Sequence, residues 1–149
     1  MGQNPAVARI ELDRAVAWAG PGPVPTAHQA AGDELEASLA ALGFHVRELE
    51  GERIVSAESF FPELYRALGL EGCDPSWGGF ARCRAGAEFP DLLAVLWNRA
   101  DHSAFFNLKV VVEAAHAFVE WDRERAAEDR QVALFLLGQS RDFPRPGPD

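Results

Sequence analysis

The apolar residues of the chain gather in two uninterrupted runs, Leu92–Trp97 (LLAVLW) and Val132–Leu137 (VALFLL). Strands with no polar face are typical of a parallel sheet that is covered on both sides. A third strand is predicted at Phe44–Leu49, ahead of both runs. Consecutive parallel strands must be joined by right-handed crossovers, with helices over both faces of the sheet. The pattern therefore predicts an α/β fold with a three-stranded parallel core sheet flanked by helices.

Two helices are predicted around the first of these strands from apolar residues at helical spacing. The segment Asp33–Leu42 places its leucines on one face, and Gly43 follows it as a residue suited to ending a helix. The helix after the strand is expected to begin at Ser59 rather than Ser56, because Pro62 then falls within the first turn, where proline costs little.

Two further helices are predicted in the second half of the chain. A short helix capped by Ser76 is expected to reach about Arg84, although the two glycines in its first turn weaken it by roughly 1 kcal/mol each relative to alanine. A long helix is expected to begin at Asp101 or Ser103 and to run to about Glu128. Its apolar positions at helical spacing are Leu108, Val111, Val112, Ala115, Phe118 and Val119.

The length of 149 residues favours one domain with a substantial core. Residues 1–32 are predicted to form an N-terminal arm or linker, in which Ile10–Trp18 is compatible with a strand or a short helix and Gly20–Pro25 with a loop. The domain is expected to span residues 33–138. Residues 139–149, which contain three prolines, are predicted to be a disordered tail.

The chain carries 23 acidic and 14 basic residues, a formal charge of −9. This balance disfavours nucleic acid and favours a basic protein partner, although acidity also serves solubility. No apolar run approaches the ~20 residues that span a bilayer, and the N-terminus lacks the basic start and apolar stretch of a signal peptide. We therefore expect a cytoplasmic protein that contacts neither membrane nor nucleic acid.

Residue types that carry chemistry are sparse. Cys73 and Cys83, the only cysteines, are expected to stay reduced in a chain that is not exported, with a disulfide between them as the minor alternative. The stretch Asp101–Ser103 contains triad residue types, but it favours a helix cap because sequence neighbours do not face one another productively. Phosphate-binding glycine loops, zinc motifs and dinucleotide fingerprints do not occur. The sequence predicts no enzyme activity, no cofactor and no metal site.

The predicted domain contains a series of short sequence motifs: Leu49–Ile54 (LEGERI), Ser59-Phe60, Tyr65–Leu70 (YRALGL), Ser76-Trp77 with Phe80 and Cys83, and Pro90 before Leu92–Asn98. Their order and spacing over Phe44–Gly138 resemble the barstar family, small bacterial proteins that inhibit ribonucleases. Barstar-like proteins read similarly: a strand, "DG..I", a helix ending "ALGL", an "N-W/L-D-A-L-x-D-C-L" helix, a proline, an apolar strand ending in Trp, a long helix and a last apolar strand. Longer members of the family have an N-terminal extension, which Asp33–Gly43 resembles.

The resemblance implies a binding surface on the short helix and the loop before it, which plug the nuclease active site. In the family, two carboxylates a turn apart occupy phosphate subsites, and an acid near the end of the third helix assists them. Carried over by position, the two acids fall on Gly78 and Arg82, and the helix begins at Ser76 and Trp77. Arg82 reverses the charge, so a nuclease site built from cations should repel it.

Three other residues complete the implied surface. Glu120 matches the acid of the third helix, and Asp74 precedes the short helix, where it could replace a lost carboxylate. Gly79, beside Gly78, allows either a close backbone approach by a partner or a tight turn. Trp77 fits a partner anchor, but packing against the sheet is the stronger interpretation.

Two functional hypotheses follow from the resemblance. The first is a monomeric barstar-like inhibitor of a ribonuclease, or the immunity partner of a nuclease toxin, which plugs the active site of a basic partner. The second is a divergent module of the same fold that binds a protein but has lost ribonuclease inhibition, because Gly78 and Arg82 stand in place of the acids.

Overall fold

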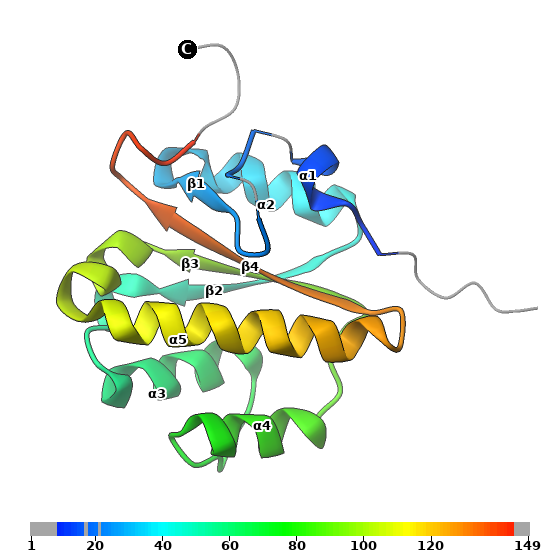
Figure 1. Ribbon diagram of the computed structural model, residues 1–149, viewed down its shortest axis with the longest axis vertical. Helices are drawn as coiled ribbons and strands as arrows, with labels where there is room; N and C mark the ends of the chain where they lie inside the picture. The colour runs from blue at the N-terminus through cyan, green and yellow to red at the C-terminus, as the bar shows by residue number, and fades with distance from the viewer. Residues whose placement is uncertain (1–8, 17, 21, 145–149) are drawn as a thin grey trace, which may run out of the picture.

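The chain folds into a parallel sheet between two layers of helices, as the computed structural model in Figure 1 shows. The structure describes residues 9–16, 18–20 and 22–144. The elements follow in the order α1 (Leu12–Ala15), β1 (Thr26–His28), η1 (Gln29–Ala31), α2 (Gly32–Ala41), β2 (His45–Glu50), η2 (Gly51–Arg53), α3 (Ala57–Leu68), α4 (Trp77–Ala85), β3 (Leu92–Asn98), α5 (Ala100–Ala126) and β4 (Gln131–Gly138).

The sheet has four strands in the order β1-β4-β3-β2, and every neighbouring pair is parallel. The predicted α/β fold with a parallel sheet flanked by helices is therefore confirmed, and the expectation of three strands is wrong by one. The additional strand is β1, within the segment expected to be an arm or linker. Three residues after Pro25 are too short to show a strand period, and their pairing depends on β4, for example through the Leu136 N–H donating to the Pro25 carbonyl at 3.0 Å.

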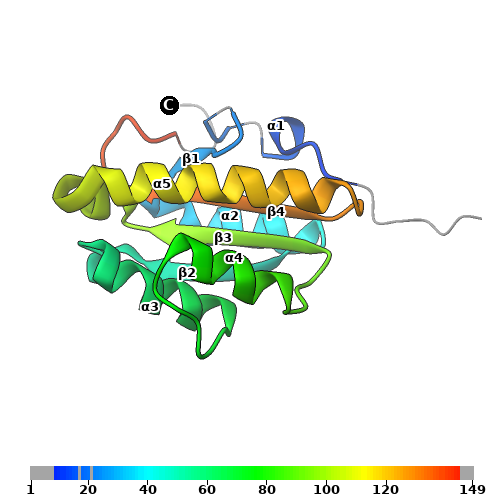
Figure 2. The same ribbon diagram turned by 60° about the horizontal axis from the view of Figure 1, so that its bottom comes forward.

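Alternate side chains of the central strands pack into two separate hydrophobic cores, one on each face of the sheet. On one face, β3 and β4 pack against α3, α4 and α5 through residues that include Leu93, Val95, Trp97, Val132 and Leu134. On the other face, the same strands pack against α1 and α2 through Leu92, Ala94, Leu96, Ala133 and Phe135. This two-sided burial explains the fully apolar runs in the sequence. In Figure 2, α3, α4 and α5 lie together on one side of the sheet, and Figure 1 shows that α4 is the one farthest from the strands.

The helix α3 begins one turn earlier than expected. Its N-cap is Ser56, whose hydroxyl accepts from the Ser59 N–H, while the Ser59 side chain satisfies the Ser56 N–H in return. This capping box satisfies two backbone donors, and Pro62 lies inside the helix as an exposed residue. The expectation that Ser59 is the cap is therefore wrong, whereas the end at Gly69, with φ of 72°, agrees with the prediction.

The long helix α5 is kinked. It begins at Ala100, before either expected cap, and Asn107 interrupts it with φ −157° and ψ 83°. The Asn107 side chain accepts from the Val110 N–H at 3.2 Å and so caps the second part. Two of the apolar positions at helical spacing, Leu108 and Val112, are exposed.

The N-terminal arm lies on the α2 side of the sheet. Of the two possibilities for Ile10–Trp18, a short helix is found, as α1. Ile10 is joined to the start of β4 by two hydrogen bonds with the Gln131 side chain, at 2.8 and 3.1 Å. Of the expected tail, residues 139–144 are described, whereas 145–149 lie outside the described residues.

Candidate partner-binding surface

The helix α4 agrees with its sequence prediction. It spans Trp77–Ala85, and the Ser76 hydroxyl accepts from the Gly79 N–H at 3.0 Å. Two arginines, Arg82 and Arg84, stand in its last turn, and its first turn holds no acid. Arg82 is 71% exposed and stands where the family's pattern would have a carboxylate. Arg84 is only 12% exposed, because it packs over the rings of Phe80 and Trp121.

The loop before α4 is fixed by contacts to the carbonyl of Asp74. The Tyr65 hydroxyl donates to this carbonyl at 2.6 Å, and the Ser76 N–H donates to it at 2.8 Å. The backbone of Gly79 lies so close that a Cβ there would stand 2.3 Å from the same oxygen. Burial raises the pKa of Tyr65, so its hydroxyl remains a donor across the neutral range. The absence of a side chain at Gly79 thus lets α4 approach the Asp74 backbone of the same chain, rather than a partner.

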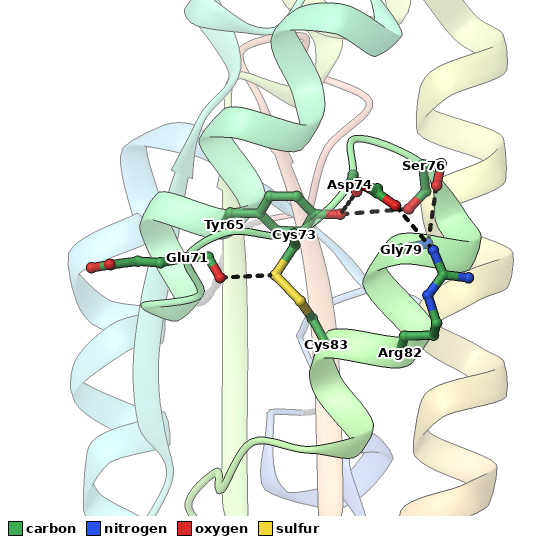
Figure 3. The surroundings of a disulfide bond; sticks show 8 residues. All are labelled: Tyr65, Glu71, Cys73, Asp74, Ser76, Gly79, Arg82 and Cys83. Atoms are coloured by element: carbon green, nitrogen blue, oxygen red, sulfur yellow. Dashed lines mark hydrogen bonds and ion pairs between the residues drawn. A yellow bond between two sulfur atoms is a disulfide. The ribbon is translucent and has the colours of Figure 1, made fainter.

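A disulfide joins the same loop to α4. Cys73 and Cys83 are bonded, with their Cα atoms 6.1 Å apart (Figure 3). The expectation that both remain reduced thiols is therefore wrong in this structure. A spacing of ten residues gives no sign of the bond, because the turn at the Asp74 carbonyl and the two helical turns after it are what bring the second cysteine back to the first.

Arg82 and Asp74 pair with each other on the surface. The Arg82 Nη2 lies 3.1 Å from the Asp74 Oδ2, and the two side chains are 71% and 75% exposed. A pair this exposed stabilises the fold by less than ~1 kcal/mol. Its effect is on the surface charge, because Asp74 neutralises Arg82 and does not stand free as a replacement carboxylate. Gly78 is exposed, with only the Arg82 guanidinium near its Cβ position.

Trp77 is half-buried in an aromatic cluster. Its ring lies 5.4 Å from Phe60, 4.9 Å from Phe61 and 6.0 Å from Phe80, measured between ring centroids. The indole N–H donates to the Glu113 carboxylate on α5 at 3.3 Å. The tryptophan therefore packs against α3 and α5, with part of the residue still exposed.

The side of α5 that borders α4 is acidic. Glu113, Glu120 and Glu124 follow one another at spacings of seven and four residues, which places them on one stripe of the helix. Glu124 accepts from Arg84 at 2.7 Å, and this hydrogen bond holds the pKa of the carboxyl below its usual value. Glu120 is exposed and lies 3.5 Å from Arg123. Glu120 is thus the least constrained acid beside α4.

The structure brings the seven predicted site residues to one side of the sheet. Five are exposed, namely Asp74, Ser76, Gly78, Arg82 and Glu120, whereas Trp77 is half-buried and Gly79 is buried. Sequence reasoning missed Tyr65 and Glu113, the two side chains that hold the loop and the tryptophan. Tyr65 lies within the YRALGL motif, but nothing in the nearby sequence indicates that its hydroxyl bonds to the carbonyl of Asp74, nine residues away.

A separate cavity of about 570 Å³ lies at the carboxyl ends of the strands, and its lining includes Asp33, Glu36, Glu48, Glu50 and Glu52. Burial, followed by the neighbouring Glu48, raises the pKa of Glu36. The rim is internally paired. Asn98 donates to Glu48 at 2.8 Å and accepts from Gln29 at 2.9 Å. These bonds tie the strand ends to η1.

Comparisons with known proteins give no match, either to a protein-family model or to a curated protein. Among the residues that the structure describes, no group of three or more His, Cys, Asp or Glu side chains is arranged to hold a metal ion. In the same part of the chain, every helix is too short or too polar to cross a membrane. Function is therefore inferred from α4 and its neighbours.

Proposed function

We propose that this chain is a barstar-like protein-binding module, not an enzyme, and that α4 with the loop before it forms its binding surface. The leading candidate is an inhibitor of a ribonuclease, or the immunity partner of a nuclease toxin. In this role α4 enters the active site of a basic partner. The net charge of −9 would speed the encounter with such a partner.

One observation carries the proposal, namely the order of the elements from β2 to β4. A strand, a helix, a short capped helix, a proline, an apolar strand ending near Trp97, a long helix and a last apolar strand follow in the order of the barstar-like pattern. The short helix is also the outermost element on its side of the sheet (Figure 1). A helix at that place is available to a partner without any rearrangement of the core.

A second candidate is a module of the same fold that binds a partner of different charge. The pair between Arg82 and Asp74, 3.1 Å apart, favours it. A guanidinium stays protonated in any site, and its planar fork suits a carboxylate. On this surface Glu120 is the one carried-over acid, and it lies 3.5 Å from Arg123. A cationic nuclease site would therefore meet a single carried-over carboxylate where the family pattern has three acids.

Titration of a guanyl-specific microbial ribonuclease with the purified protein distinguishes the two candidates. The first predicts inhibition that is complete at a ratio of one to one, and weaker inhibition by Glu120→Gln. Glu34→Gln is the matched control, because Glu34 is an exposed acid on α2, on the opposite side of the sheet. Unchanged ribonuclease activity at an excess of the protein would contradict inhibition of that enzyme class and favour the second candidate.

A further inference from the structure

The surface of α5 carries an apolar patch that neither the core nor α4 explains. It consists of Phe105, Phe106, Leu108 and Val112, which are 83%, 58%, 62% and 44% exposed, and we call it the kink patch. Among residues 9–16, 18–20 and 22–144, Val55 is the one other large hydrophobic side chain that is exposed. Isolated apolar residues are normal on a surface, but four within eight positions of one helix indicate a contact surface.

The patch lies on both sides of the kink in α5. The two phenylalanine rings meet edge to face, with centroids 5.2 Å apart, just before Asn107. Leu108 and Val112 follow it four residues apart, on the same side of the second part of the helix. The Asn107 side chain accepts from the Val110 N–H and so caps the second part of the helix. This hydrogen bond stabilises the backbone conformation at the kink, in the middle of the patch.

We infer that the kink patch is the interface of a symmetric homodimer in which the α5 helices of two copies pack antiparallel. The area agrees with this assignment. With roughly 200 Å² for a phenylalanine side chain, the two rings expose on the order of 280 Å², and Leu108 and Val112 bring the total to about 450 Å². An interface of standard size buries about 800 Å² per partner, of which about 57% is apolar, or about 450 Å².

The charges in the patch are self-complementary. Lys109, the only lysine of the chain, and Glu113 lie four residues apart beside Leu108 and Val112, with an N–O distance of 3.6 Å. Their side chains are 81% and 43% exposed. A two-fold axis between antiparallel helices sets Lys109 of each copy against Glu113 of the other. The contact therefore buries one charge of each sign per copy, despite the overall charge of −9.

This dimer departs from the monomer expected from the sequence. The sequence pattern assigned Leu108 and Val112 to the regular apolar spacing of a straight helix. In the observed helix Val111 is buried as expected, and Val110 and Ala114 are buried with it, whereas Leu108 and Val112 are exposed.

The experiment is sedimentation velocity on the full chain, from about 5 to 500 μM. The proposal predicts a monomer–dimer equilibrium that Phe105→Ser and Leu108→Asp each weaken by at least about tenfold, because each substitution occurs twice in the dimer. Circular dichroism and thermal unfolding verify that these exposed variants stay folded. Val55→Ser is the matched control, which should leave the equilibrium constant within about twofold.

A charge exchange tests the antiparallel arrangement. Lys109→Glu and Glu113→Lys should each weaken self-association, whereas a mixture of the two variants should form a heterodimer, because each chain then meets the opposite charge at both positions. A chain that stays monomeric at 500 μM overturns the proposal and assigns the patch to another protein or a lipid surface. A dimer that is unchanged by Phe105→Ser and Leu108→Asp overturns it as well.

Discussion

The two neighbouring glycines of α4 should respond in opposite ways to the same added methyl group. At Gly79, a Cβ would lie 2.3 Å from the Asp74 carbonyl oxygen, 2.7 Å from its Cβ and 2.9 Å from its carbonyl carbon. At Gly78, the nearest atom is the flexible Arg82 guanidinium, at 3.6 Å. Both residues are helical, so alanine improves helix propensity at each by up to about 1 kcal/mol.

The loop around Asp74 has little freedom to yield, because Tyr65 and the disulfide both hold it. Overpacking of this kind costs typically 1–3 kcal/mol, which exceeds the gain in propensity. We expect Gly79→Ala to lower the free energy of unfolding by about 1–2 kcal/mol and Gly78→Ala to raise it by up to about 1 kcal/mol. With an m-value near 2 kcal/mol per molar urea, the two midpoints should differ by about 1 M.

Urea unfolding followed by circular dichroism measures both variants under the same conditions. If Gly79→Ala is as stable as the wild type, the close approach to Asp74 does not exist as described. If both variants lose the same free energy, the loss reflects the helix start rather than that contact. The outcome matters for function because this contact sets the loop that introduces the candidate binding helix.

Three further predictions concern the same side of the molecule. Reduction of the Cys73–Cys83 bond, which closes a loop of ten-residue separation, should lower the free energy of unfolding by roughly 3 kcal/mol, and an unchanged urea midpoint would contradict a bonded native state. Burial raises the pKa of Glu63, but its hydrogen bonds to Arg66 and to the Glu50 N–H outweigh this effect and leave the pKa below its usual 4.5. The ionised carboxylate therefore stabilises the fold at neutral pH, and this stabilisation is lost as the pH falls through the pKa of Glu63 in the folded state. Glu63→Gln should therefore flatten the acid limb of unfolding free energy against pH, and identical limbs would argue against the pairing. Phe80→Ala, at a side chain 1% exposed, should cost about 3–5 kcal/mol by the general behaviour of buried phenylalanines. Phe105→Ala, at 83% exposure, should change the unfolding free energy by less than ~0.5 kcal/mol at a protein concentration where the chain is monomeric.

The parts of the fold that could be predicted are those whose signal is local. The runs at β3 and β4 are apolar because both faces of these strands are buried, and Ser76 caps α4 as expected. The parts that were missed depend on contacts between distant segments. The edge strand β1 exists through its pairing with β4.

The helix boundaries show the same limit. The start of α3 was decided by two serines that satisfy each other's backbone, against the position of Pro62. The kink at Asn107 was missed because an asparagine inside an apolar helix gives no sign in sequence that its side chain will cap a new turn.

For the candidate site, sequence could indicate α4 and the reversed charge at Arg82, but not the environment of these residues. The pairing of Arg82 with Asp74 changes the meaning of both residues, since the nearest carboxylate is engaged with the arginine. The disulfide and the Tyr65 bond to Asp74 likewise depend on how the loop folds back over α4.

The central claim is that α4 is the binding surface of a barstar-like module, and restoring its two missing acids tests it most directly. We predict that Gly78→Asp with Arg82→Asp will bind a guanyl-specific microbial ribonuclease at least about tenfold more tightly than the wild type, measured by isothermal titration calorimetry at constant salt. Ala37→Asp with Arg14→Asp makes the same change in net charge on the far side of the sheet and should give less than about a threefold effect. Equal affinities for the two double variants would contradict the claim.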